Sequence, residues 1–179
     1  MNRDPIVQTE RVRIQRLGEK DLPWLYELHE NASVNRFRQP ATVHLDHQAV
    51  RKKLQMNLRN EARLGFGMWK MVLHSGEAIG CAGFSLCEET SEVELEFYLA
   101  EPYWGQKYAS EVTEALVNWF FENTYFTHLI AKVHPDNIGA RVILNRLDFY
   151  FRENLLQQEQ RCDVMQLLSP VFQKMTARA

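Results

Sequence analysis

The feature that most constrains the fold is a series of three strand-like segments joined by very short connections. The segments read FGMWKMVLH, EAIGCAGFSL and EVELEFYLA, and they are divided by SGE and CEETSE. Connections of this size are typical of β-hairpins, which join antiparallel neighbours. The middle of the chain is therefore predicted to be an antiparallel meander.

One further strand and two helices are predicted before the meander. Residues 10–17 alternate between apolar and polar side chains, which indicates a half-exposed strand. Residues 19–31 carry apolar side chains at helical spacing, and Asp21 is the expected N-cap. Residues 46–63 repeat an apolar residue every four positions until Gly65 breaks the pattern, so they are predicted to form a second helix.

The segment that follows the meander is predicted to alternate between helices and strands. The expected elements are a helix over residues 108–121, a strand over 128–133, a helix over 137–147 and a closing strand pair, FYFRENLL and RCDVMQLL. The strand, helix and strand between Glu92 and Val133 predict a parallel crossover within an otherwise antiparallel sheet. Ligands of such sheets bind where the crossover helix begins, which here is the stretch PYWGQKYASE, residues 102–111.

Length and composition favour one globular domain over residues 1–179, with a loose tail at 174–179. The 179 residues are 45% hydrophobic and 25% charged, which is enough to build one core. Lys and Arg number 21 against 23 Asp and Glu, and this balance disfavours nucleic acid as the main partner.

The cysteines and the N-terminus favour a cytoplasmic protein. The three cysteines lie in apolar stretches and lack the spacing of a disulfide framework or a zinc site, so no metal is expected. The first ten residues lack the apolar segment of a signal peptide, and no run approaches the ~20 apolar residues that cross a bilayer.

The N-terminus of the helix that starts near Tyr108 is a candidate anion site. Its first backbone N–H groups have no partner within the helix and lie at the positive end of the helix dipole, so they suit a pyrophosphate. A tight turn capped by water is the alternative reading.

Four fragments in the same order resemble the GNAT superfamily of acyl-CoA-dependent N-acyltransferases, and within it the RimJ/RimL type. They are TERVRIQRL followed by KDL, then IGCAGF, then VELEFYLAEPYWGQKYASE, and finally AKVHPDNIGARVILNRLDF. The third is similar to the family pattern ELGYWLxPxYWGQGYATE, and the fourth to AxVxPxNxASxRVLEKLGF. The resemblance covers nearly the whole chain. It implies an α+β fold with a mixed, mainly antiparallel sheet, helices on both faces and one parallel crossover.

The resemblance also implies a binding site for acetyl-CoA, the expected co-substrate. The strand over residues 92–99 would carry a bulge and separate from the strand over 129–133, so that the pantetheine arm lies between them. The residues implied to contact the co-substrate are Phe97, Tyr98, Leu99, Trp104, Gly105, Gln106, Lys107, Tyr108, Ala109, Ser110 and Asn137. Asn137 is also the expected N-cap of the helix that follows it.

In this family an amine attacks the thioester directly, so the catalytic candidates are acids and bases rather than a nucleophilic cysteine. Glu92, Glu94, Glu96 and Tyr98 share one face of an ideal strand, although such a row can also be a solvated face. Glu94 is the first choice for the general base, because its position matches a carboxylate that other GNAT enzymes use. His134 is a reserve, since a histidine titrates near neutrality, and Tyr98 and Tyr103 are possible acids for the thiolate.

Three positions depart from the family pattern. Lys107 and Asp148 replace glycines, and Ala140 replaces a serine that is a candidate acid in some relatives. A lysine is compatible with a negative φ, so the loop is expected to keep its backbone N–H groups available. Without the serine, the proton donor has no assignment.

These observations leave several functions open. The first hypothesis is acetyl transfer to a primary amine, such as a protein α-amino group, whose pKa near 8 leaves it neutral more often than a lysine. A polyamine, an amino sugar or a small metabolite are alternative acceptors, and an oligomer is possible. The second hypothesis is a GNAT-fold protein that binds CoA or a partner without turnover. A third is a partner-binding surface on residues 46–63, whose mixed charges favour an ordinary solvated helix instead. Residues 31–40 could close over the acceptor or form a surface loop.

Overall fold

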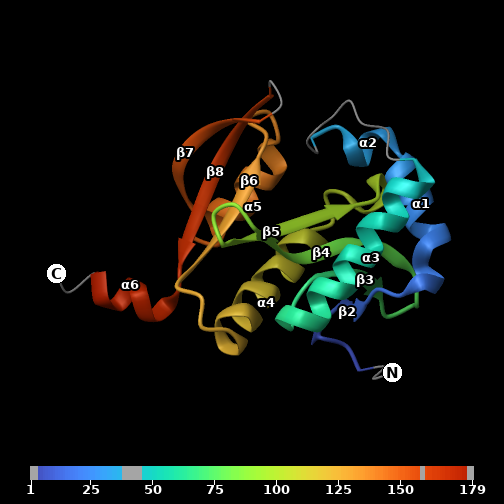
Figure 1. Ribbon diagram of the computed structural model, residues 1–179, viewed down its shortest axis with the longest axis horizontal. Coiled ribbons are helices and arrows are strands. Elements are labelled where there is room, and N and C mark those ends of the chain that lie inside the picture. Colours follow the sequence, from blue (N-terminus) through green and yellow to red (C-terminus); the bar gives the residue numbers. More distant parts are fainter. Residues whose placement is uncertain (1–3, 38–45, 158–159, 177–179) are drawn as a thin grey trace.

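The computed structural model describes residues 4–37, 46–157 and 160–176, which build an eight-stranded sheet covered by helices (Figure 1). The strands lie in the order β1-β2-β3-β4-β5-β6-β8-β7. They are β1 (Val7–Gln8), β2 (Val12–Arg16), β3 (Met68–Leu73), β4 (Ala78–Cys87), β5 (Glu92–Leu99), β6 (His128–Val133), β7 (Tyr150–Gln157) and β8 (Gln160–Leu168). The α-helices are α1 (Leu22–Glu30), α2 (Ala32–Asn35), α3 (His47–Leu64), α4 (Tyr108–Asn123), α5 (Ile138–Arg146) and α6 (Pro170–Thr176).

The pairing of the strands confirms the predicted meander and crossover. β3, β4 and β5 pair antiparallel in sequence order, and β5 then pairs parallel with β6 after the helix α4. All other pairs are antiparallel, so the predicted mixed, mainly antiparallel sheet is confirmed. One implication of the resemblance is wrong: β5 pairs with β4 without a register shift from Glu92↔Cys87 to Leu99↔Gly80, so these two fully described strands contain no bulge between them.

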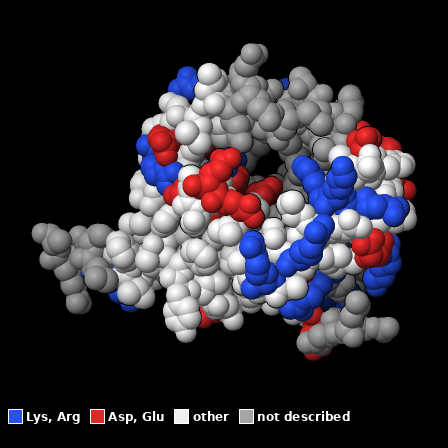
Figure 2. Space-filling view, viewed as in Figure 1, with Lys and Arg blue, Asp and Glu red and all other residues white. Residues whose placement is uncertain are grey.

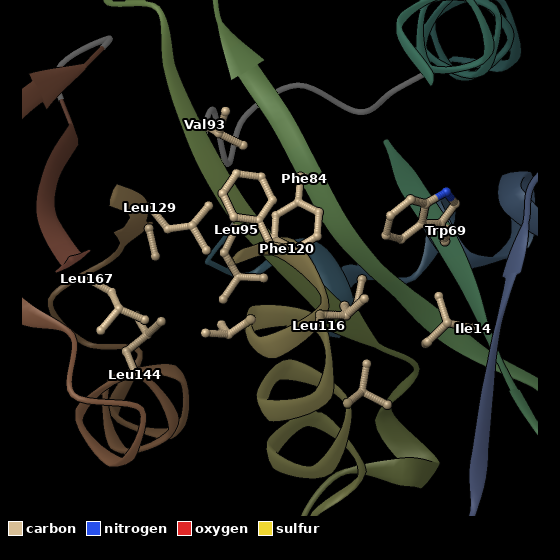
Figure 3. Packing of buried hydrophobic residues seen from close by; sticks show 14 of the residues in the cluster. Ile14, Trp69, Phe84, Val93, Leu95, Leu116, Phe120, Leu129, Leu144 and Leu167 are labelled. Carbon is tan, nitrogen blue, oxygen red and sulfur yellow. The ribbon is translucent and has the colours of Figure 1, made fainter. Parts of the chain in front are cut away.

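The main core lies between the sheet and α4. Val93, Leu95 and Leu99 alternate along β5 and pack with Val112, Leu116 and Phe120 of α4, because successive strand residues point to opposite faces. Figure 3 shows Phe84, Leu95 and Phe120 together at the centre of this cluster. The apolar stripe of α4 is thus core, as its helical spacing predicted.

The opposite face of the sheet is covered by α1 and α3. Leu22, Leu25 and Leu28 of α1 pack with Val50 and Leu54 of α3, and Cys81 and Tyr98 of the sheet contact this second cluster. Helices therefore cover both faces, as expected. Glu94 and Glu96 share the parity of Tyr98 along β5, so they belong to the face of the sheet that α1 and α3 cover.

Several details differ from the sequence-based expectation. Asp21 precedes α1 but makes no cap hydrogen bond to it, because its carboxylate accepts from the Gly18 N–H and pairs with Lys70 at 2.6 Å. The predicted tail from residue 174 is partly wrong, since α6 continues to Thr176, while residues 177–179 lie outside the described part. In the described ranges, no helix combines the length and apolar character that a membrane span requires.

Candidate active site

A cleft opens where β5 and β6 separate. The two parallel strands are in register at Glu94↔Ile130, and beyond this point the cleft of about 710 Å³ lies between residues 94–99 of β5 and 131–133 of β6. Figure 2 shows a hollow on this side of the molecule, between a group of acidic side chains and a group of Lys and Arg side chains. The separation of the strands thus creates the space that the resemblance implied for a pantetheine arm.

Nearly all the residues predicted for the site line this cleft. They are Glu94, Phe97, Tyr98, Leu99, Trp104, Gly105, Lys107, Tyr108, Ala109, Ser110, His134 and Asn137. Gln106 does not line it: its side chain donates to the Pro102 carbonyl at 2.8 Å, and its own carbonyl accepts from Arg11 at 3.1 Å. Gln106 therefore holds the loop together instead of facing the cleft.

Backbone N–H and C=O groups of successive β5 residues point alternately toward β4 and toward the gap beside β6. The Ala100 N–H donates to the Ile79 carbonyl at 2.9 Å, so the backbone groups of alternate residues, including Tyr98, point toward β4. The backbone groups of Phe97 and Leu99 consequently point toward the gap beside β6. The Leu99 carbonyl already accepts from the Trp104 indole N–H at 2.8 Å. This leaves the two groups of Phe97 and the Leu99 N–H as the backbone partners best placed for an extended ligand.

The loop before α4 contains two residues in the left-handed region, Gly105 with φ 73° and Lys107 with φ 67°. The expectation that Lys107 takes a negative φ is therefore wrong. Lys107 occupies the N-cap position, and α4 begins directly after it at Tyr108. The left-handed turn keeps the backbone direction that a glycine would give, and the first residues of α4, Tyr108, Ala109 and Ser110, line the cleft. The loop thus keeps its shape, and the backbone of Lys107 is sterically strained because Lys107 is not a glycine.

Asn137 caps the helix α5, as its position predicted. Its Oδ1 accepts from the Ala140 N–H at 3.2 Å, and both residues line the cleft. Ala140 places a methyl group where the family pattern has a hydroxyl, so α5 offers no side-chain proton donor at this position.

Glu94 is the carboxylate at the mouth of the gap. Its Oε2 lies 3.1 Å from Lys132 Nζ on β6, and its side chain is only 14% exposed. Burial and the neighbouring charge of Glu96 raise the pKa of Glu94 to about 7, although Lys132 opposes this rise. Burial acts to lower the pKa of Lys132, but the charge of Glu94 and its hydrogen bond, with smaller contributions from two cysteines, together raise that pKa. Glu94 thus combines access to the cleft with a proton affinity suited to neutral pH.

The other two glutamates of the row have structural partners. Glu92 pairs with Arg152 and with His128, and the hydrogen bond from Arg152 is the main reason that its pKa falls to about 2. Glu96 accepts a hydrogen bond from the Ser85 hydroxyl at 2.5 Å and also lines the cleft. The row is therefore not a simple solvated face, and its three carboxylates have distinct surroundings.

The remaining catalytic candidates lie around the same space. His134 accepts the Asp136 N–H at its Nδ1, at 3.2 Å, and its ring lies 5.7 Å from that of Phe37. The Tyr98 ring lies 5.7 Å from that of His29. A hydrogen bond with Glu77 raises the pKa of Tyr103 to about 12, which makes its hydroxyl a weaker acid than an ordinary tyrosine.

Within the segment 31–40, which was expected to close over the acceptor or to form a surface loop, Ser33, Val34 and Phe37 line the cleft, and residues 38–40 lie outside the described part of the chain. Sequence reasoning missed Lys53, Lys132 and Cys162, which also line the cleft. Lys132 lies within a quoted motif but has no local signal, because only the register of β6 with β5 brings it beside Glu94. Burial raises the pKa of the Cys162 thiol to about 11, so this thiol is a poor nucleophile at neutral pH.

The comparisons with known proteins agree with this geometry. Residues 11–150 match the acetyltransferase (GNAT) domain family. A protein of Bacillus licheniformis, called uncharacterized N-acetyltransferase p20, is 27% identical over 158 residues, which cover 86% of each chain. A protein of Bacillus subtilis, called uncharacterized N-acetyltransferase YoaA, is 22% identical over 155 residues, covering 86% of this chain and 87% of the relative.

Solved structures share the fold at low sequence identity. The ribosomal L7/L12 α-N-protein acetyltransferase RimL, in complex with coenzyme A, superposes with a TM-score of 0.79 at 17% identity, covering 92% of this chain and 98% of that one. The spermidine N-acetyltransferase of Vibrio cholerae, in complex with CoA and spermine, gives a TM-score of 0.73 at 12% identity, covering 88% and 95%. With the cleft, the crossover and the matched family region taken together, the chain belongs to the GNAT family of acetyltransferases.

Proposed function

We propose that the protein transfers an acetyl group from acetyl-CoA directly to a primary amine, with Glu94 as the general base. The observation that carries this proposal is the position of Glu94, a carboxylate with a pKa of about 7 at the point where β5 and β6 separate. In the reaction, Glu94 takes a proton from the attacking nitrogen, a C–N bond forms at the thioester carbonyl, and the C–S bond breaks to release CoA.

The loop before α4 and the exposed edge of β5 would bind the co-substrate. The first N–H groups of α4 suit a pyrophosphate, because they are unpaired and lie at the positive end of the helix dipole. Phe97 and Leu99 offer backbone groups for the pantetheine amides, and Asn137 offers its Nδ2. Tyr98 and His134 are proposed to contact the acyl end or the amine.

For the acceptor, we propose a protein or peptide α-amine. A base with a pKa near 7 is better matched to an α-amine, with its pKa near 8, than to a lysine near 10.4. By their names, one solved relative acts on the α-amine of a ribosomal protein, and the other acts on spermidine, a polyamine. The cytoplasmic location expected from the sequence stays a prediction.

Release of CoA from acetyl-CoA tests the reaction and the acceptor together. The panel is a short peptide with a free α-amine, a lysine peptide with a blocked α-amine, a polyamine and an amino sugar. We expect turnover to be fastest with the free α-amine. Faster turnover with the blocked lysine peptide or the polyamine would overturn the acceptor assignment.

The variant Glu94→Gln tests the base, and Glu89→Gln is its control because Glu89 is an exposed carboxylate of the β4–β5 turn. We expect Glu94→Gln to lower kcat by about 10²-fold or more, the usual contribution of a general base, with CoA affinity retained. Glu89→Gln should behave as the unmodified protein. A Glu94→Gln variant with full kcat would exclude this role.

A second function, CoA binding without turnover, is favoured by two features of the cleft. Ala140 stands where the family pattern has a hydroxyl, and Lys107 in the loop before α4 has a left-handed backbone. This function predicts CoA binding in calorimetry with no acetyl transfer to any amine of the panel. It also predicts that the double variant Lys107→Gly with Ala140→Ser gains acetyl transfer. Acetyl transfer by the unmodified protein would exclude this second function.

A further inference from the structure

Arg11, just before β2, contacts the loop ahead of α4 on both sides of Lys107. Its Nη1 donates to the Gln106 carbonyl at 3.1 Å, and its guanidinium carbon lies 4.5 Å from the centre of the Tyr108 ring. Arg11 is almost a hundred positions away in sequence, so these contacts depend on the folded sheet. Arg11 thus contacts both sequence neighbours of Lys107, Gln106 and Tyr108.

A second set of contacts fixes Arg11 itself to the first turn of α4. Its backbone N–H donates to Glu111 Oε1 at 2.9 Å, and its Nε and Nη2 lie 2.7 and 2.6 Å from Glu111 Oε2. Two nitrogens of the guanidinium therefore contact the Glu111 carboxylate, and the Arg11 side chain cannot turn away from the loop without breaking this ion pair. Burial acts to raise the pKa of Glu111, but hydrogen bonds from Thr9 and Arg11 outweigh it and lower that pKa.

The pair also has an electrostatic consequence for an anion bound at the helix start. A carboxylate in the first turn of a helix interacts with the same positive helix end that would attract a phosphate, and it repels that phosphate. The positive charge of Arg11 compensates the charge of Glu111. The first N–H groups of α4 are then left to a ligand instead of facing an uncompensated carboxylate.

Lys107 needs such support, because a lone lysine does not favour the left-handed region. Strained backbone persists where the surrounding contacts fix it in place. In this loop the fixing contacts are those of Arg11 with Gln106 and Tyr108, together with the hydrogen bond from the Gln106 side chain to the Pro102 carbonyl.

We propose that Arg11 is a positioning residue for the acyl-CoA site: it holds Lys107 in the left-handed conformation and neutralises Glu111, so that the N–H groups of α4 can bind the pyrophosphate. The proposal rests on the acetyl-CoA chemistry proposed above. It assigns Arg11, which does not itself line the cleft, a role in co-substrate affinity.

The test is the CoA dissociation constant of Arg11→Gln, measured by calorimetry, and the KM values for both substrates. We expect the Kd for CoA and the KM for acetyl-CoA to rise about tenfold, while kcat and the KM for the amine change by less than about twofold. Arg16→Gln is the matched control, because Arg16 of β2 forms a comparable pair with Glu61, at 2.9 Å, away from the cleft. An Arg11→Gln variant with the CoA affinity of the Arg16→Gln variant would overturn the proposal.

A rescue variant separates positioning from general damage to the fold. In Arg11→Gln with Lys107→Gly, the glycine adopts the left-handed conformation without support, so we expect the part of the CoA affinity that depends on the loop conformation to return, while the part lost to uncompensated Glu111 stays lost. If the double variant binds CoA as weakly as Arg11→Gln alone, the proposed support of Lys107 is wrong.

Hydrogen exchange gives a measurement that does not depend on CoA. We expect the amides of residues 105–112 to exchange about tenfold faster in Arg11→Gln than in Arg16→Gln, because the loop loses its support. Equal exchange would refute the positioning role. Failure of the unmodified protein to bind CoA would count against the proposed function alone, since the exchange result would still decide whether Arg11 holds the loop.

Discussion

Glu94 of β5 and Lys132 of β6 face each other across the parallel strand pair, with 3.1 Å between Oε2 and Nζ. This pair makes the pKa of the proposed base depend on a positive charge on the neighbouring strand. Because Lys132 lowers the pKa of Glu94 against the effects of burial and Glu96, the value of about 7 is a balance that one substitution can shift.

The variant Lys132→Met should move the pH dependence of kcat/KM. A general base acts when it is deprotonated, so the rate of the unmodified protein should rise with pH through about 7. Without the positive charge the pKa of Glu94 rises, and the rising limb should shift to higher pH by about one unit. Rates from pH 5 to 9 with one fixed amine check this, because the titration of the amine is common to both proteins.

The control for this shift is Lys20→Met, which removes an exposed lysine of the segment before α1. Its profile should overlay that of the unmodified protein. If the rising limb of the kcat/KM profile of Lys132→Met stays in place or moves to lower pH, Glu94 is not the titrating base.

The strain at Lys107 should be visible in stability. A side chain in the left-handed region costs about 1 kcal/mol relative to glycine, so Lys107→Gly should have a free energy of unfolding about 1 kcal/mol above that of Lys107→Ala. Urea unfolding of the two variants measures the difference. At Lys52, an exposed position in the interior of α3, the order should reverse, because glycine is the poorer helix former there. Equal stability of the two Lys107 variants would mean that the turn relaxes and stores no strain.

The pair of Glu92 and Arg152 should govern part of the stability in acid. The pKa of Glu92 falls from 4.5 to about 2 in the folded protein, so its contribution is complete above pH 4.5 and is lost as the pH falls toward 2. We expect Glu92→Gln to lower the free energy of unfolding at pH 7 by about 2 kcal/mol, after allowance for solvent screening of partly exposed groups. The variant should also lose less stability than the unmodified protein between pH 4.5 and 2.

Denaturant unfolding at several pH values measures both effects. Glu88→Gln is the control, because Glu88 belongs to the same hairpin but is 78% exposed and lies 3.8 Å from Arg63. It should change stability by less than about 0.5 kcal/mol. If the two variants show the same acid dependence, the ion pair of Glu92 does not stabilise the fold.

The missing hydroxyl on α5 gives a prediction for turnover. Ala140 lines the cleft within the first turn of α5, so Ala140→Ser would add a hydroxyl to the cleft that, under the proposed function, could protonate the leaving thiolate. We expect kcat to rise by up to about tenfold, a modest share of what a general acid can contribute. Ala62→Ser on the exposed side of α3 should leave kcat unchanged. An unchanged kcat in Ala140→Ser would show that protonation of the thiolate does not limit the rate.

Much of the fold follows from local patterns in the sequence. The meander is predicted because three strand-like segments follow one another with connections too short for anything but hairpins. The helix α4 is predicted because Val112, Leu116 and Phe120 repeat at helical spacing. The two-residue strand β1 and the four-residue helix α2 are too short to show a period, and the predicted tail from residue 174 overlaps the end of α6.

The site is less predictable, because it depends on contacts between distant segments. The family pattern has a glycine at the position of Lys107, which is compatible with a positive φ, but the contacts from Arg11 that fix the lysine there are not local in the sequence. In the same way, the proton affinity of Glu94 depends on Lys132, whose approach requires the register of β5 with β6. Asn137 was predictable because its cap is local, formed with a residue three positions away.

The register point of Glu94 and Ile130 joins two parts of the sheet, β1 to β5 on one side and β6 to β8 on the other (Figure 1). The two parts of the sheet are mechanically coupled through this short contact between β5 and β6, here called the seam, and α4 packs against one face of it. Under the proposed function, an acyl donor seated along the seam would stiffen the whole protein as well as react in it. The folded lifetime of the protein in a cell would then follow the supply of its own acyl donor.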